Sequence, residues 1–192
     1  MPRPRRLATL LTALLIAGGL TACGKHLDEK ARTIHLEFEG LYLPVGELKY
    51  QVQISRAMNP YDTQDKAYLV GVPAAERALD TDETWFGVFL RVQNETDEEV
   101  LPSRDIEILD TQETVFEPIE LAPANVFAYR FDEPIPPRQV LPLPDSAAYD
   151  TPARGALVLF KLKNSTLDNR PLELKIENRQ PPAQTGIIDL DV

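Results

Sequence analysis

Hydrophobic and polar residues alternate with a period of two along much of the chain. In residues 84–94, the apolar residues at even positions from Phe86 to Val92 would share one face of an extended strand, whereas a helix would spread them around its surface. Similar short apolar or alternating segments lie at 47–56, 66–72, 104–110, 114–119, 125–131, 155–162, 171–178 and 186–192. The pattern predicts seven to nine short strands.

Turn-forming residues separate these segments. A polar turn, "NETDEEV", follows the strand at 84–94, and Thr111-Gln112-Glu113 joins residues 104–110 to 114–119 as a hairpin. Residues 155–162 are apolar almost throughout, which is typical of a strand buried on both faces. Since no segment shows a convincing amphipathic helix, this spacing predicts an all-β sandwich.

From Trp85 to Val192, the order of elements resembles the immunoglobulin-like domains of bacterial surface lipoproteins of unknown function. The resembling segments are "WFGVFLRVQNETDEEV", "IEILDTQETVFEP" and the late strand "GALVLFKL". The resemblance implies an immunoglobulin-like antiparallel β-sandwich without catalytic residues. The antibody-type Cys…Trp…Cys signature is impossible here because the chain has one cysteine.

The first 23 residues have the pattern of a secretion signal. Three arginines in "MPRPRR" precede 14 mostly apolar, uncharged residues, a stretch too short for a stable membrane span. The following Leu20-Thr21-Ala22-Cys23 resembles the lipobox of bacterial lipoproteins. That resemblance implies that the Cys23 thiol receives a diacylglyceryl group and that cleavage leaves Cys23 as the first residue. A plain secretory signal with an incidental cysteine is the alternative.

These patterns divide the chain into three parts. Residues 1–22 are expected to be a lipoprotein signal peptide, residues 23–45 the lipidated cysteine and a tether, and residues 46–192 the sandwich domain. Within the tether, "TIHLEFEG" alternates and could pair as a short strand.

Two or more acyl chains anchor a protein stably. We therefore expect an extracytoplasmic monomer, held through Cys23 at the outer face of the cell membrane or at the outer membrane.

Charge and residue types narrow the chemistry. Loss of the three signal-peptide arginines would take the formal charge from −10 to −13, which disfavours nucleic-acid partners. His26 and His35 are the two histidines, so a catalytic triad or a zinc site is not expected. Carboxylates are plentiful, which makes calcium the one metal that the composition favours. Its best candidate loop contains Asp80 and Asp82, but the spacing and glycine of a calcium-binding loop are missing, so a solvated acidic loop is the preferred interpretation.

Together these features predict a membrane-anchored, non-enzymatic binding or scaffolding module without a cofactor. Its partner would be a protein or another component of the cell envelope. A solute-binding accessory of a transporter and a carboxylate-dependent hydrolase stay open as alternatives. Exposed aromatic residues would favour binding, whereas a deep pocket with converging carboxylates would favour catalysis. The proline-rich stretch at 123–152 is expected to be a rigid crossover loop, with a proline-rich ligand for a partner's groove as the alternative.

Overall fold

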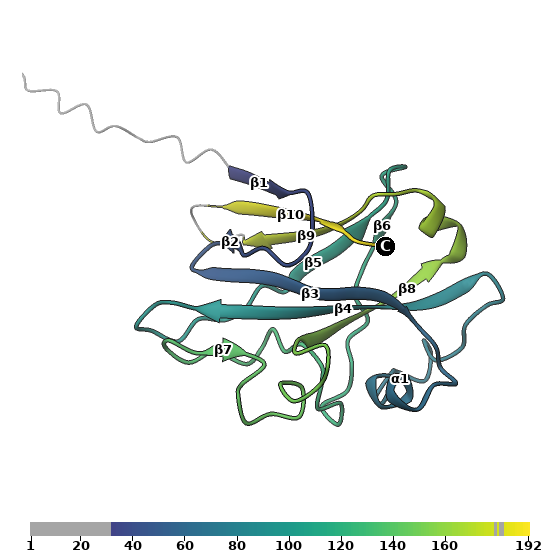
Figure 1. Ribbon diagram of the computed structural model, residues 1–192, viewed down its shortest axis with the longest axis horizontal. Coiled ribbons are helices and arrows are strands. Elements are labelled where there is room, and N and C mark those ends of the chain that lie inside the picture. The colour runs from purple at the N-terminus through teal and green to yellow at the C-terminus, as the bar shows by residue number, and fades with distance from the viewer. Residues whose placement is uncertain (1–31, 179, 181–182) are drawn as a thin grey trace, which may run out of the picture.

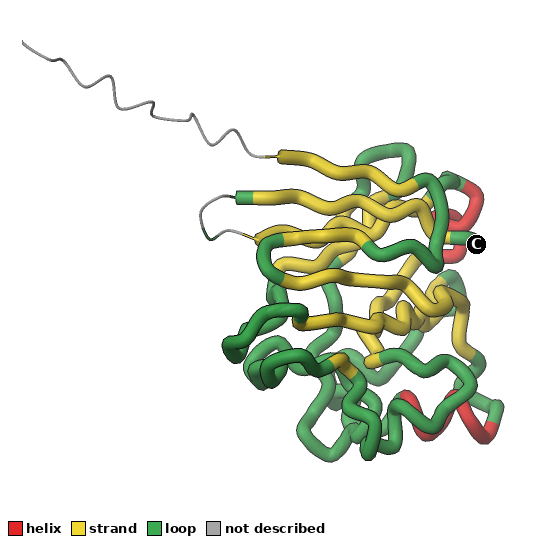
Figure 2. The backbone as a smooth tube through the Cα atoms, turned by 60° about the vertical axis from the view of Figure 1, so that its left-hand side comes forward, coloured by secondary structure: helices red, strands yellow, loops and turns green. Residues whose placement is uncertain are grey.

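A computed structural model of the chain describes residues 32–178, 180 and 183–192. It contains two packed β-sheets with loops and one short helix gathered beside the second sheet (Figures 1 and 2). No helix in these described ranges is long and apolar enough to cross a membrane. The expected signal peptide, Cys23 and His26 lie outside the described residues.

The described residues form ten strands, one α-helix and one 3-10 helix. In chain order they are β1 (Arg32–Leu36), β2 (Leu43–Val45), β3 (Leu48–Met58), α1 (Thr63–Tyr68), β4 (Glu83–Asn94), β5 (Asp105–Leu109), β6 (Val115–Phe116), β7 (Val140–Leu141), β8 (Ala156–Lys163), η1 (Asn164–Asp168), β9 (Leu172–Asn178) and β10 (Gln184–Leu190).

The two sheets have the pairing order of an immunoglobulin-like sandwich. The first sheet has the order β1-β10-β9-β5-β6, and in the second, β2, β3 and β4 are neighbours in that order while β7 and β8 both pair with β4. In the letter nomenclature of immunoglobulin domains, β3, β4 and β8 correspond to strands A, B and E of one sheet. The strands β5, β9 and β10 correspond to strands C, F and G of the other sheet. The predicted all-β sandwich is confirmed, although it has more strands than expected and β1 pairs with β10 in parallel.

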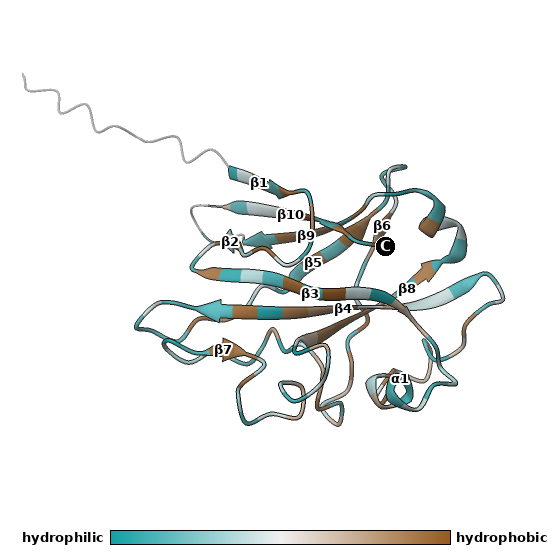
Figure 3. Ribbon diagram, viewed as in Figure 1, coloured by the Kyte–Doolittle hydropathy of each residue, from teal (hydrophilic) through white to brown (hydrophobic). Residues whose placement is uncertain are grey.

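The main core lies between the two sheets, and β4 runs through its centre. Phe86, Val88, Leu90 and Val92 are all 0% exposed and lie in this core, as the alternation predicted. The first sheet contributes the inward residues of β5, β9 and β10. Figure 3 shows the corresponding alternation of apolar and polar residues along β3.

A second, smaller core covers the outer face of the second sheet. Trp85 and Phe89 of β4 lie there with Leu157 and Leu159 of β8. Tyr68 at the end of α1 covers them, and its ring meets the Phe89 ring edge-on at a centroid distance of 5.0 Å. The strand at 155–162 is therefore buried on both faces as predicted, and most of β4 is as well.

Residues 32–45 correct the expected tether, because they form β1 and β2 of the sandwich. β1 extends the first sheet beside β10, and β2 pairs with β3 in the second. Leu43 and Val45 are 0% and 2% exposed in the main core. Burial of these two side chains explains why the segment folds, so the sandwich includes residues from Arg32 onward and not only from Gly46.

Two further expectations are corrected between the strands. Residues 125–131 form a loop with an isolated bridge at Ala128, where a strand was expected. The segment at 66–72, expected to be a short strand, is instead the end of α1 followed by a turn. This helix begins after Asp62, because the Asp62 carboxylate accepts hydrogen bonds from the Gln64 and Asp65 N–H groups. The proline-rich stretch at 123–152 is a crossover of loops that contains only the two-residue strand β7.

Candidate functional site

A cleft of about 950 Å³ opens between β5 and the chain segment 117–133. It exists because β6 is only two residues long and pairs only with Ile108 and Leu109 of β5. After Phe116 the chain leaves the first sheet. Among the described strands, none pairs with residues 105–107 on that side of β5, so this part of the strand edge lines the cleft.

The opposite wall is segment 117–133, which forms hydrogen bonds with the edge of β8 that faces away from β4. The backbone N–H groups of Ile119 and Tyr129 donate to the carbonyls of Leu159 and Leu157 at 2.7 and 2.8 Å. Within this wall, the Arg130 guanidinium donates to the carbonyls of Leu121, Ala122 and Asn125 at 2.8 to 3.0 Å. Arg130 therefore stabilises the conformation of this segment.

Tyr129 also ties this wall to the interior of the sandwich. Its hydroxyl donates to the Ser103 carbonyl at 2.8 Å, and the Ser103 N–H donates to the Tyr50 hydroxyl at 2.7 Å. Burial raises the pKa of Tyr129 well above its usual value and the pKa of Tyr50 to about 12. Both hydroxyls therefore stay protonated near neutral pH and act as structural ties.

Charged residues of both signs line the cleft, with acids in excess. Lys175 Nζ lies 2.7 Å from Glu107 and 2.8 Å from Glu177, and these hydrogen bonds raise the pKa of Lys175. The Arg104 guanidinium carbon lies 4.2 Å from the centre of the Phe131 ring, a cation–π contact that joins the two walls. The exposed acids of the cleft outside β5 and β9 are Glu117, Glu120, Asp132 and Glu133.

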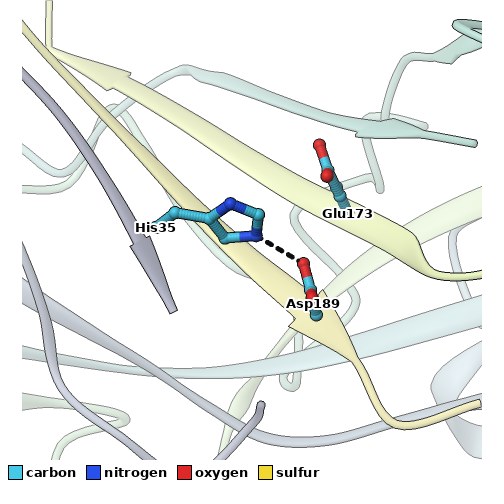
Figure 4. Close-up of side chains that lie close together, drawn as sticks. All are labelled: His35, Glu173 and Asp189. Atoms are coloured by element: carbon cyan, nitrogen blue, oxygen red, sulfur yellow. Dashed lines mark hydrogen bonds and ion pairs between the residues drawn. The ribbon is translucent and has the colours of Figure 1, made fainter. Parts of the chain in front are cut away.

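A second polar cluster lies on the outer face of the first sheet. Figure 4 shows His35 of β1 pointing toward Asp189 of β10, with Glu173 of β9 beyond it. His35 Nε2 is 2.6 Å from Asp189 Oδ1, and this hydrogen bond raises the pKa of His35. One donor atom from each residue lies within 4.8 Å of the other two. Within the described ranges, no other three His, Cys, Asp or Glu residues meet this condition.

The acidic loop containing Asp80 and Asp82 already has a cation beside it. Lys163 Nζ lies 3.2 Å from Asp82 and 3.1 Å from Glu83. Glu83 also accepts a hydrogen bond from the Asp80 N–H, and this bond, followed by that from Lys163, lowers the pKa of Glu83. The structure thus pairs the Asp82 and Glu83 carboxylates of this loop with Lys163.

No known protein family and no curated protein matches this chain. Among solved structures, an uncharacterised β-sandwich protein from Clostridium difficile 630 aligns with 84% of this chain and 95% of its own, at 12% identity and a TM-score of 0.47. The yjhA protein from Bacillus subtilis aligns with 81% of this chain and 100% of its own, at 9% identity and a TM-score of 0.46.

Proposed function

We propose that this protein is a lipid-anchored, extracytoplasmic binding module that receives an extended segment of a partner protein in the cleft beside β5. The observation that carries the binding site is the edge of β5 at Ile106 and Glu107, beside which no described strand lies on the cleft side and which lines the cleft. The lipobox pattern around Cys23 supports the anchor.

The edge of a β-strand is a ready template for another extended chain. Its unpaired backbone N–H and C=O groups can pair with an incoming strand, which then joins the sheet. At β5 such a segment would lie next to Ile106 and opposite the wall fixed by Tyr129 and Arg130. A cleft of about 950 Å³ has the size expected of a specific binding site. The geometry therefore favours an extended peptide as the occupant.

The charge of the cleft favours a basic segment. Its exposed lining includes Glu117, Glu120, Asp132 and Glu133. The chain without its expected signal peptide has a formal charge of −13. Such a field repels phosphate-rich polymers and attracts cationic partners. We therefore take the partner to be a protein whose extended segment carries lysine or arginine together with apolar side chains.

The hydrolase alternative receives less support from the same cleft. The carboxylates of Glu107 and Glu177 both contact Lys175 Nζ, so an ammonium group lies where a substrate would have to bind between them. A pair of carboxylates that acts on a glycosidic bond needs room for substrate between its two members.

Site-specific photo-cross-linking in native membranes tests the proposal. A photoreactive residue is placed at Glu133 in the cleft or at the exposed control position Asp145, outside the cleft. We expect a discrete adduct with one partner from position 133 and none from position 145. The charge-reversed variant E117K/E120K should lose the adduct, whereas D145K should keep it. Equal adducts from both positions, no adduct from position 133, or an adduct that E117K/E120K leaves unchanged would overturn the proposal.

A further inference from the structure

We propose that His35, Glu173 and Asp189 form a binding site for a divalent transition-metal ion of the zinc type on the outer face of the first sheet (Figure 4). This site is separate from the cleft, because none of the three residues lines it.

The strand register brings the three side chains together. β10 lies between β1 and β9, and Asp189 stands directly opposite Glu173 in the antiparallel pair. In the parallel pair, His35 is level with Ile187, which lies two residues before Asp189. Since residues two apart on a strand share a face, all three side chains project from the same side of the sheet. The hydrogen-bond ladders therefore fix their positions.

The charges of the cluster are incompletely compensated. Two carboxylates directly opposite each other on neighbouring strands repel. His35 binds Asp189 only, whereas Glu173 has no hydrogen-bond or ion-pair partner anywhere in the described part of the chain. A cation placed among the three groups would satisfy both carboxylates together.

The distances are compatible with one ion after small side-chain rotations. A tetrahedral zinc ion holds its nitrogen and oxygen ligands at about 2.1 Å, which places donor atoms about 3.4 Å apart. In the structure, the His35 and Asp189 donor atoms are 2.6 Å apart, and every donor pair of the cluster lies within 4.8 Å. The His35 side chain is 45% exposed, so water can complete the coordination.

The donor set selects the class of ion. One imidazole nitrogen with two carboxylate oxygens suits zinc and its neighbours, which combine nitrogen and oxygen ligands. Calcium takes six to eight oxygen ligands and does not favour imidazole. We therefore use Zn²⁺ alone as the probe.

Isothermal titration calorimetry of the full chain in detergent with Zn²⁺ tests the site. We expect one ion per chain, with affinity reduced about tenfold or more in both H35A and E173Q. The matched control is D145N, which removes an exposed carboxylate outside both the cluster and the cleft and should bind Zn²⁺ as the wild type does. E173Q is the sharpest variant because it leaves the His35–Asp189 bond intact. Absence of saturable binding, or E173Q binding with wild-type affinity, would overturn the proposal.

Discussion

Leu43 packs directly against Gly186, although the two residues belong to different sheets and lie far apart in the sequence. A β-carbon at position 186 would clash with Leu43 Cδ2 and would lie 2.6 Å from Val45 Cγ2. β2 and β10 therefore approach closely across the sandwich, and the space that glycine leaves open is filled by the aliphatic side chains of β2. β2 is therefore part of the core, and β1 extends the first sheet beside it.

This packing predicts how N-terminal truncation affects stability. A chain that begins at Arg32 should unfold cooperatively, with the stability of the full sandwich. A chain that begins at Gly46 loses Leu43 and Val45 and exposes the edges of β3 and β10, so it should be strongly destabilised. Urea denaturation followed by circular dichroism compares the two chains. Equal transition midpoints would contradict the assignment of β2 to the core.

Two adjacent residues of β4 provide a matched test of the main core. Leu90 is 0% exposed, so L90A should lower the free energy of unfolding by about 2–5 kcal/mol. Arg91 is only partly buried on the opposite face of the strand, and R91A should cost less than about 1 kcal/mol. Urea denaturation of both variants measures the difference. A larger loss in R91A than in L90A would mean that the faces of β4 are reversed.

The Arg56–Asp65 pair predicts a pH dependence of stability. Asp65 is buried, and the Arg56 guanidinium donates to its two carboxylate oxygens at 3.0 and 2.5 Å. These hydrogen bonds are the main reason why the pKa of Asp65 is lowered. In the unfolded chain an aspartate has a pKa of about 3.9, so the unfolded state binds more protons just below that pH. The stabilisation is therefore present above about pH 4 and is lost as the pH falls.

Unfolding experiments on D65N at several pH values check this sign. The difference in the free energy of unfolding between wild type and D65N should be largest near neutral pH and should shrink below about pH 4. D145N, at an exposed position, serves as the control and should show no such change. A wild-type-to-D65N difference that stays constant from neutral to acidic pH would contradict the assigned role of the pair.

Local alternation was sufficient to predict the strands that have long, regular patterns. β3, β4, β8, β9 and β10 all fall within or close to the expected segments because each buries at least one regular face. The alternation at 125–131 predicts a strand, but this segment is a loop whose Phe127 and Ala128 pack in the second core without a ladder of their own. Burial alone does not distinguish a packed loop from a strand.

The two candidate sites depend on relationships that a linear pattern does not contain. The sequence pattern places His35 in a tether, and only the pairing of β1 with β10 brings it to Asp189. The alternation in "TIHLEFEG" and "GIIDLDV" was a signal that both residues lie on polar strand faces, but it did not say which strands are neighbours. The cleft likewise results from the early end of β6 at Phe116.

Intact mass spectrometry of the protein extracted from the membranes of expressing cells tests the proposed anchor, and with it the extracytoplasmic location, most directly. We predict a chain that begins at Cys23 and carries the added mass of a diacylglyceryl group, while C23A yields no lipid-modified product. An unmodified wild-type chain with a different first residue, or the same lipid mass on C23A, would contradict the account.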